Sequence, residues 1–257
     1  MRVYLLGQHI QYSASPAMQT AGFRAAGLDG WSYELLDVPA ESVPDAVGRL
    51  RDPGVAGANV TIPHKLAVLE LCDDVEPQAR AVGAVNTVVN DGGTLRGSNT
   101  DIGAIRGALT EVGVQPGPHV RALILGGGGS ARAAGAALEG SRIVFALRRP
   151  AHPELPGDVV DWGERDALAR DADVLINATP LGRSGEEPVA PANLPRAGAV
   201  IDLVYTPAGT PLQRAARDAG LRTVDGWSVL LAQGAASFKA WTGVEAPIDE
   251  MRAALGS

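Results

Sequence analysis

The chain has 257 residues, of which 46% are hydrophobic and 20% charged, and its formal net charge is −7 at pH 7. This composition is typical of a globular protein, and the length predicts one large domain or two modest domains. The acidic balance excludes a broad basic surface for nucleic acid, and no apolar run approaches the ~18 residues of a membrane-spanning helix.

Short apolar strands alternate with amphipathic helices through residues 1–100. This alternation predicts βαβ units and a largely parallel sheet. The strand-like segments are residues 3–7, 32–38 and 56–62, and helix-like stretches begin near Pro16 and Glu41.

Two local signals add detail to this pattern. Ser15 and Pro16 predict a helix start, with the serine hydroxyl as N-cap and the proline in the first turn. The segments VNTVVND and TLRGSN, separated by Gly92 and Gly93, predict a β-hairpin because glycine readily adopts the backbone angles of a tight turn.

A second α/β unit is predicted after the connector QPGPHV. The strand RALIL (121–125) leads into a helix of small residues, and further buried strands are expected at residues 142–147, 173–179 and 199–205. The last helical stretch, SVLLAQGAASFKAWTG, is expected to pack on the first unit. The first domain would then be discontinuous in sequence.

Gly126, Gly128 and Ala131 form the pattern G-x-G-x-x-A directly after a predicted strand and before a predicted helix. Glycines permit a tight turn and a close approach of the backbone, and the helix N-terminus presents N–H groups to a pyrophosphate. Such turns also occur where they serve packing alone, but the position of this one favours dinucleotide binding.

The residues after the next strand indicate which dinucleotide binds. NAD-binding proteins carry an acidic residue roughly 20 positions after the first glycine, where it bonds the ribose 2′-hydroxyl. Arg148 and Arg149 occupy that place, and residues 142–149 contain no acidic residue. Since guanidinium groups pair with a 2′-phosphate, we predict NADP as the cofactor; the alternative is a solvated strand end.

Lysine is rare in this chain. Of the 22 Lys+Arg residues only Lys65 and Lys239 are lysines, which leaves 22 − 2 = 20 arginines. Unlike arginine, lysine can surrender a proton, so Lys65 in NVTIPHK is a candidate acid–base group as well as an ordinary surface cation. Ser13, Ser15 and Asp101 are candidate polar contacts for a substrate, although Ser15 and Asp101 could equally be helix caps.

The sequence indicates no metal. Cys72 is the only cysteine, which predicts neither a disulfide framework nor a cysteine-based metal site, and the four histidines are dispersed. His64 lies beside Lys65, but at an alternating strand end it should point to the other side. We expect a cytoplasmic protein with no nucleic-acid or membrane partner.

Motifs along nearly the whole chain occur in the order known from one enzyme family. They are SASP (13–16), NVTIPHK (59–65), GAVNTV (83–88), NTD (99–101), GGGGSARAA (126–134), INATPLG (176–182), IDLVYTP (201–207) and GWSVLLAQGAASFKAWTG (226–243). In these segments the chain resembles the shikimate dehydrogenase family. The resemblance implies reversible, NADP-linked reduction of 3-dehydroshikimate to shikimate in aromatic amino-acid biosynthesis.

The resemblance also implies the architecture: an α/β enzyme of two domains with a cleft between them, as a monomer or homodimer. Residues 1–101 and 229–257 would form the substrate domain, and residues 102–228 the Rossmann-like NADP domain. The implied catalytic pair is Lys65 and Asp101. Lys65 would be the general acid of the reduction, and Asp101 would orient it.

The resemblance assigns the remaining site residues by position. Besides Lys65 and Asp101, the implied substrate contacts are Ser13, Ser15, Asn59, Thr61, Asn86, Tyr205 and Gln233. The implied cofactor contacts are Gly126, Gly127, Gly128, Gly129, Ser130, Ala131, Arg148, Arg149, Asn177, Thr179 and Gly226.

Two alternatives stay open at this point. Gln19-Thr20 replaces the usual His-Asn pair of the family, and Val229-Leu230 replaces the usual Met-Leu. These changes keep a sister enzyme, a quinate or aminoshikimate dehydrogenase, open as the first alternative. A different class of protein, a catalytically silent nucleotide- or shikimate-binding sensor, is the second alternative, because fold alone does not establish function.

Overall fold

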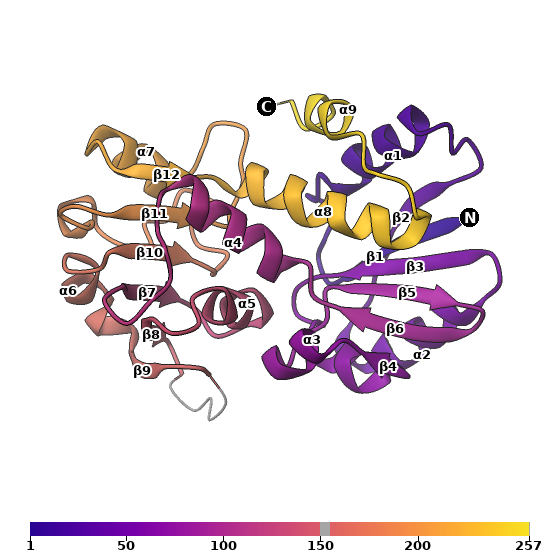
Figure 1. The fold of residues 1–257 in the computed structure, drawn as a ribbon, viewed down its shortest axis with the longest axis horizontal. Coiled ribbons are helices and arrows are strands. Elements are labelled where there is room, and N and C mark those ends of the chain that lie inside the picture. Colours follow the sequence, from indigo (N-terminus) through magenta and orange to yellow (C-terminus); the bar gives the residue numbers. More distant parts are fainter. Residues whose placement is uncertain (150–154, 257) are drawn as a thin grey trace. The chain divides into compact units, whose positions relative to one another are not determined.

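A computed structural model of the protein describes residues 1–149 and 155–256, which form two compact units (Figure 1). The first unit comprises Met1–Thr100 and Leu231–Ser257, and the second comprises Asp101–Leu230. Each unit contains one β-sheet and flanking helices, which confirms the predicted α/β class. The assignment of one domain to substrate and the other to the dinucleotide stays a prediction.

The first unit contains a mixed sheet with the strand order β2-β1-β3-β5-β6-β4. Strand β1 pairs in parallel with β2 and β3, whereas β5 runs antiparallel to β3 and β6. The strands are β1 (Arg2–Gly7), β2 (Ser32–Asp37), β3 (Val55–Val60), β4 (Asp74–Val75), β5 (Thr87–Asp91) and β6 (Thr94–Ser98).

The predicted hairpin is confirmed as β5–β6, with Gly92 at φ +59° and Gly93 at φ +95° in its turn. Only glycine adopts such angles at low cost. This hairpin adds two antiparallel pairs, β3–β5 and β5–β6, while β1–β2, β1–β3 and β4–β6 are parallel as expected, so the sheet of the first unit is mixed.

Both faces of this sheet are buried. Val3 and Leu5 of β1 pack with Phe23 and Phe238, while Leu6 belongs to the core on the opposite face. This alternation follows from the two-residue period of a strand, and each buried Leu or Phe contributes roughly 1.5–3 kcal/mol. The helices of this unit are α1 (Ser15–Ala25), α2 (Val43–Gly48), α3 (Pro77–Val82), α9 (Ile248–Ala253) and the second half of α8 (Gly226–Thr242).

Helix α1 begins one residue earlier than predicted. Its N-cap is Ala14, Ser15 is already helical, and no side chain makes a capping hydrogen bond. The Ser13 hydroxyl accepts the backbone N–H of Ser15 at 3.2 Å instead, so the interpretation of Ser15 as the N-cap is wrong. Near Glu41, a single 3-10 turn (Ala40–Ser42) precedes α2.

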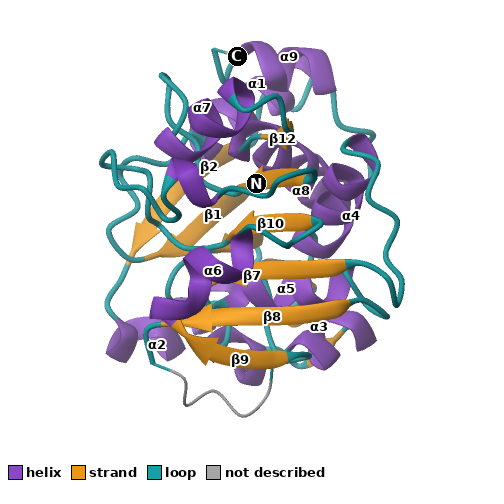
Figure 2. Cartoon of the chain, turned by 90° about the vertical axis from the view of Figure 1, so that its left-hand side faces the viewer, coloured by secondary structure: helices purple, strands orange, loops and turns teal. Residues whose placement is uncertain are grey.

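The second unit contains a parallel sheet with the strand order β12-β11-β10-β7-β8-β9. Counted from β7, this is the doubly wound order 3-2-1-4-5-6 of dinucleotide-binding domains, in which ligands bind beyond the carboxyl ends of the strands. Figure 2 shows β10, β7, β8 and β9 side by side. The strands are β7 (Arg121–Leu125), β8 (Arg142–Leu147), β9 (Asp158–Asp161), β10 (Val174–Asn177), β11 (Ala199–Asp202) and β12 (Arg222–Val224).

Strands β7 and β8 have the predicted bounds, but β10 and β11 end earlier than expected, at Asn177 and Asp202. The side chains of these two residues bond the backbone that follows them, at Thr179 and Val204, which turns the chain out of the sheet. The helices of this unit are α4 (Asp101–Glu111), α5 (Gly129–Ala137), α6 (Arg165–Ala169), α7 (Pro211–Asp218) and the start of α8.

Candidate active site

Lys65 lies in a turn after β3, and only 8% of it is exposed. Its backbone carbonyl accepts the N–H of Val85 at 2.9 Å. The neighbouring His64 is buried, and its Nε2 lies 2.8 Å from the carbonyl oxygen of Val38. Since a carbonyl only accepts, Nε2 carries the proton in this bond. His64 therefore anchors the turn, and Lys65 is the candidate acid–base group.

Asn86 is the centre of a buried network beside this turn. Its Oδ1 accepts the N–H of Thr100 at 2.8 Å and the hydroxyl of Thr87 at 3.0 Å, while its Nδ2 donates to Thr100 Oγ1 at 3.0 Å. The first residue of α4, Asp101, follows Thr100 directly and is 7% exposed. Asn86 thus bonds the segment that ends at Thr100. Asn86 also follows Val85 in the chain, whose N–H bonds the Lys65 carbonyl and so holds the turn in place.

Asn59 connects the same network to α8. Its Nδ2 donates to the Ser237 hydroxyl at 2.9 Å, and its Oδ1 accepts the Tyr33 hydroxyl at 2.8 Å. Ser237 Oγ lies 2.8 Å from Thr87 Oγ1 and 3.0 Å from the carbonyl of Gln233, one helical turn earlier. Ser237 is absent from the predicted site, although its spacing of four residues from Gln233 places both on one face of a helix.

The other predicted substrate contacts of this unit lie close to the ends of β1 and β3. Thr61 follows β3, and its N–H donates to the carbonyl of Leu6 at 2.8 Å. Ser13 lies in the loop between β1 and α1, and Ser15 is 5% exposed at the start of α1. Because β1 and β3 run in parallel, these residues all follow the same edge of the sheet.

The glycine loop has the geometry that its sequence predicts. Gly126 has φ +105°, and a Cβ there would lie 3.1 Å from the Thr179 methyl carbon and 3.2 Å from the Ala178 carbonyl oxygen. A Cβ at Gly128 would meet nothing within 4 Å, so this backbone is open to a ligand. Ala131 is fully buried in the first turn of α5. Gly127, Gly129 and Ser130 lie in the same strand-to-helix turn.

These observations fit a dinucleotide phosphate, which needs open backbone N–H groups at a helix N-terminus. Arg148 and Arg149 follow β8 and are exposed. The N–H of Gly126 donates to the carbonyl of Ala146 at 3.1 Å, so the glycine loop runs along the strand that ends just before Arg148. This placement suits the 2′-phosphate that distinguishes NADP.

Asn177 is fully buried at the end of β10. Its Oδ1 accepts the Thr179 hydroxyl at 2.7 Å, and its Nδ2 donates to the carbonyl of Leu181 at 3.0 Å and to Asp202 Oδ1 at 2.9 Å. Asp202 lies within the motif IDLVYTP but is absent from the predicted site. The signal that could have found it is an acidic residue at the end of a predicted buried strand.

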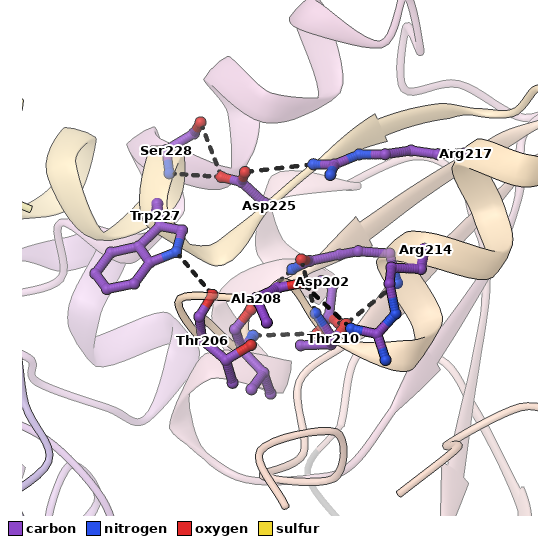
Figure 3. Close-up of polar contacts among 11 residues, drawn as sticks. Asp202, Thr206, Ala208, Thr210, Arg214, Arg217, Asp225, Trp227 and Ser228 are labelled. Carbon is purple, nitrogen blue, oxygen red and sulfur yellow. Dashed lines mark hydrogen bonds and ion pairs between the residues drawn. The ribbon is translucent and has the colours of Figure 1, made fainter. Parts of the chain in front are cut away.

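Tyr205 and Gly226 also lie together. The Tyr205 ring packs on Trp227 with 4.6 Å between ring centroids. Trp227 Nε1 donates to the carbonyl of Thr206 at 3.2 Å (Figure 3). Gly226 is the first residue of α8, and a Cβ there would lie 2.6 Å from the carbonyl of Val204. Glycine is therefore required for α8 to start against this loop.

The predicted site residues form two groups. In the first unit, Asn59, Asn86 and Gln233 belong to one hydrogen-bonded network; in the second unit most of them follow the carboxyl ends of β7, β8, β10 and β11, whereas Asp101 begins α4 and Gly226 begins α8. Within residues 1–149 and 155–256, no helix has the length and apolar character needed to cross a bilayer, and no three His, Cys, Asp or Glu side chains cluster as metal ligands. The prediction of no metal stays a prediction.

The strand order, the open glycine turn and the arginines after β8 define a class: an α/β protein with a dinucleotide-binding unit of the Rossmann type. Two family descriptions match the chain, "Shikimate dehydrogenase substrate binding domain" at residues 5–88 and "Shikimate 5'-dehydrogenase C-terminal domain" at residues 226–255.

Relatives and solved structures name the particular family. A shikimate dehydrogenase (NADP(+)) of Anaeromyxobacter sp. is 42% identical over 98% of this chain and 95% of its own length. The crystal structure of shikimate 5-dehydrogenase from Thermus thermophilus in complex with NADP(H) and shikimate is 36% identical, with a TM-score of 0.86 over 100% of this chain and 98% of that one. The chain belongs to the shikimate dehydrogenase family, and the resemblance inferred from its motifs is confirmed.

A further solved structure is relevant to the alternative of a quinate dehydrogenase. Quinate dehydrogenase from Corynebacterium glutamicum in complex with NAD is 29% identical, with a TM-score of 0.84 over 99% of this chain and 98% of that one. Relatives named for two substrates thus share the fold of this chain. The fold therefore does not choose between shikimate and quinate.

Proposed function

We propose that this chain is an NADP-dependent shikimate dehydrogenase, which interconverts 3-dehydroshikimate and shikimate by hydride transfer. The observation that carries the proposal is the burial of Lys65 in a turn bonded to the Asn86 segment. An ammonium withdrawn from solvent in this way acts on a neighbouring oxygen more strongly than a surface cation does. The full-length likeness to the NADP(+) enzymes supports the same function.

The carboxylate of the substrate is assigned to Ser13 and Ser15. Two hydroxyls are suitable donors for an anion, and α1, which starts at Ser15, adds the positive end of its dipole. Asn59, Thr61, Asn86 and Gln233 are the proposed contacts for the rest of the ring, with Tyr205 beside it. Asn59 and Asn86 already bond other side chains, so we propose that they shape the pocket as well as line it.

Lys65 is the proposed proton donor to the carbonyl oxygen during reduction and the proton acceptor during oxidation. NADP, when bound, would supply or accept the hydride at the carbon that bears this oxygen. Negative charge develops on that oxygen, and the Lys65 ammonium neutralises it and then transfers a proton. Asp101 is the proposed partner that orients the ammonium and accepts a bond from a substrate hydroxyl.

The cofactor assignment is NADP, with the phosphates at Gly126–Ala131 and the 2′-phosphate at Arg148 and Arg149. Gly128 is open to a ligand, and the two guanidinium groups are exposed at the strand beside the glycine loop. Asn177, Thr179 and Gly226 are the proposed contacts for the nicotinamide half. The pathway that this reaction serves is aromatic amino-acid biosynthesis.

One assay tests the function. The purified protein is incubated with shikimate and NADP⁺, and the absorbance of reduced nicotinamide is followed, with quinate and NAD⁺ as comparison substrates. We expect a rate with shikimate and NADP⁺ well above the rates of the other pairs. A higher rate with quinate would identify the sister enzyme. No rate with any pair, from a protein that binds NADPH or shikimate, would identify the sensor.

We also propose a cellular location and an oligomeric state. A cytoplasmic enzyme agrees with a composition that includes a single cysteine. A monomer and a homodimer are both retained, and light scattering on the purified chain distinguishes them.

A further inference from the structure

Asp202 is a carboxylate with no exposed surface at the end of β11. In the sheet register it lies opposite Asn177, the last residue of β10. The carboxyl ends of these two strands are where a doubly wound sheet holds its ligand. No part of the mechanism above uses Asp202.

Three donors converge on this carboxylate. Its Oδ1 accepts Asn177 Nδ2 at 2.9 Å and the backbone N–H of Val204 at 3.1 Å. Its Oδ2 accepts the hydroxyl of Thr210, a residue that also caps α7 (Figure 3). Asp202 therefore ties together the loop after β10, the loop after β11 and the start of α7.

The first of these connections reaches the glycine loop. The Asp202 bond orients the Asn177 amide, whose oxygen accepts from Thr179 and whose nitrogen donates to Leu181. Thr179 and Ala178 in turn form the wall against which Gly126 packs, since a Cβ at Gly126 would lie 3.1–3.2 Å from them. The position of that wall depends on the orientation of one buried amide.

The second connection reaches the residues around Tyr205. Val204 is held on both sides, because its N–H donates to Asp202 and its carbonyl accepts Gln213 Nε2 at 3.0 Å. Gly226 packs on the Val204 carbonyl, and Tyr205, the next residue, packs on Trp227. The same carboxylate thus places the loop that carries Tyr205 and receives the start of α8.

We propose that Asp202 is a positioning residue for cofactor binding, which holds the loop after β10 and the loop after β11 in the conformation that receives NADP. The inference rests on the proposed function, since it concerns the same cofactor. Asp202 itself need not contact the cofactor.

The chemistry of the site explains why a carboxylate serves here. All three neighbours donate, and only an ionised acid accepts at both oxygens without presenting a hydrogen of its own. Burial is costly for this group: desolvation, with a smaller contribution from the charge of Asp225, raises the pKa of Asp202 to about 6 even though three hydrogen bonds lower it. A buried charge that is retained despite such a cost points to a requirement for its geometry.

The test compares Asp202→Asn and Asp202→Ala with the matched control Asp173→Asn. Asp173 precedes β10, at the opposite end of the same sheet, where it bonds the backbone and side chain of Arg121. Binding of NADPH and of shikimate is measured separately by calorimetry, and thermal unfolding shows that each variant is folded. Hydrogen exchange of the backbone N–H groups in residues 178–182 and 203–206 is recorded without cofactor.

We expect Asp202→Asn to bind NADPH about tenfold more weakly, and Asp202→Ala more weakly still, because lost bonds to a charged group release both loops. Shikimate affinity should stay within about twofold, and exchange should rise in both loops. Asp173→Asn should match the wild type in all three measurements. If Asp202→Ala does not fold, Asp202→Asn decides the outcome.

Two outcomes would overturn the inference and stay distinct from a failure of the proposed function. Wild-type NADPH affinity and exchange in folded Asp202→Asn would show that the loops do not depend on this carboxylate. Equal loss of NADPH and shikimate affinity would show a general structural role. If the wild type itself did not bind NADPH, the proposed function would fail instead.

Discussion

The hydrogen bonds that Asn86 makes in the first unit join neutral groups, whereas those at Asp202 in the second unit end on a carboxylate. Asn86 both donates and accepts, so a single side chain bonds Thr87 and Thr100. Asp202 only accepts, and its burial raises its pKa to about 6. A neutral amide connects segments at no electrostatic cost, while a carboxylate does so in a manner that depends on pH.

The two networks also support different parts of the proposed reaction. The Asn86 network adjoins the turn of Lys65, which would move the proton. The Asp202 network adjoins the glycine loop, which would hold the cofactor. Changes in the first unit should therefore appear in turnover, and changes in the second unit in cofactor affinity.

The largest effect is expected at Lys65. Lys65→Ala should lower kcat by several powers of ten while NADPH still binds, because the proton donor is lost and the dinucleotide site is intact; each power of ten is ~1.4 kcal/mol. Lys65→Arg should behave similarly, since a guanidinium keeps the charge but not the proton transfer. The matched control is Lys239→Arg, at the only other lysine. Steady-state kinetics measure kcat for each variant. A kcat of Lys65→Ala within a few-fold of the wild type would show that Lys65 is an ordinary surface cation.

Asn86→Ala should destabilise the first unit by about 2–4 kcal/mol, because it leaves the partly buried Thr100 N–H without its acceptor and removes one partner of the buried Thr87 hydroxyl. Since the lost hydrogen bonds join neutral groups, this loss should be the same at pH 5 and pH 8. Urea unfolding at both pH values measures it. The control Asn193→Ala removes a half-buried amide whose oxygen accepts an exposed hydrogen bond from Arg170 at 2.9 Å, and it should cost under ~1 kcal/mol. A loss that varied strongly with pH would remove the contrast between the networks.

Unlike that of Asn86, the contribution of Asp202 to stability should depend on pH. Its pKa is about 6 in the folded chain against 3.8 for the free group, so the folded state holds the proton more tightly. The contribution of Asp202 to the free energy of unfolding should then fall by about 3 kcal/mol at most as pH rises from about 4 to about 6. Above pH 6 it should stay constant.

The measurement is the difference in unfolding free energy between wild type and Asp202→Asn, which cancels the titration of the other carboxyl groups. Asp73 and Asp173 have lowered pKa values, caused first by their hydrogen bonds from Arg51 and Arg121. Their contribution to the free energy of unfolding is therefore lost as pH falls. A difference that is flat, or that rises, between pH 4 and pH 6 would contradict the raised pKa of Asp202.

The smallest effect is expected at Arg148. Arg148→Ala should raise KM for NADP⁺ about tenfold and leave KM for NAD⁺ nearly unchanged, because one guanidinium partner of the 2′-phosphate is lost and Arg149 remains. Arg142→Ala, at the exposed start of the same strand, is the control. Equal changes for both cofactors would mean that Arg148 does not read the 2′-phosphate.

Local features of the fold were predictable in detail. The bounds of β7 and β8, the turn at Gly92 and Gly93, and the open glycine loop all follow from apolar runs and glycine positions. The ends of β10 and β11 were not predictable from periodicity. Asn177 and Asp202 end these strands through their own side chains, and this competition with the sheet does not appear in an apolar pattern.

The sequence by itself determined the α/β class, the dinucleotide turn and the family, because these depend on residues that are neighbours in the chain or recur in a set order. Only the tertiary structure decided which buried polar groups meet. Asn59 bonds Ser237 across 178 positions, and Asp202 bonds Asn177 across 25. Side chains of this kind take their partners from whichever elements pack together, so Ser237 and Asp202 gained their importance only when the chain folded.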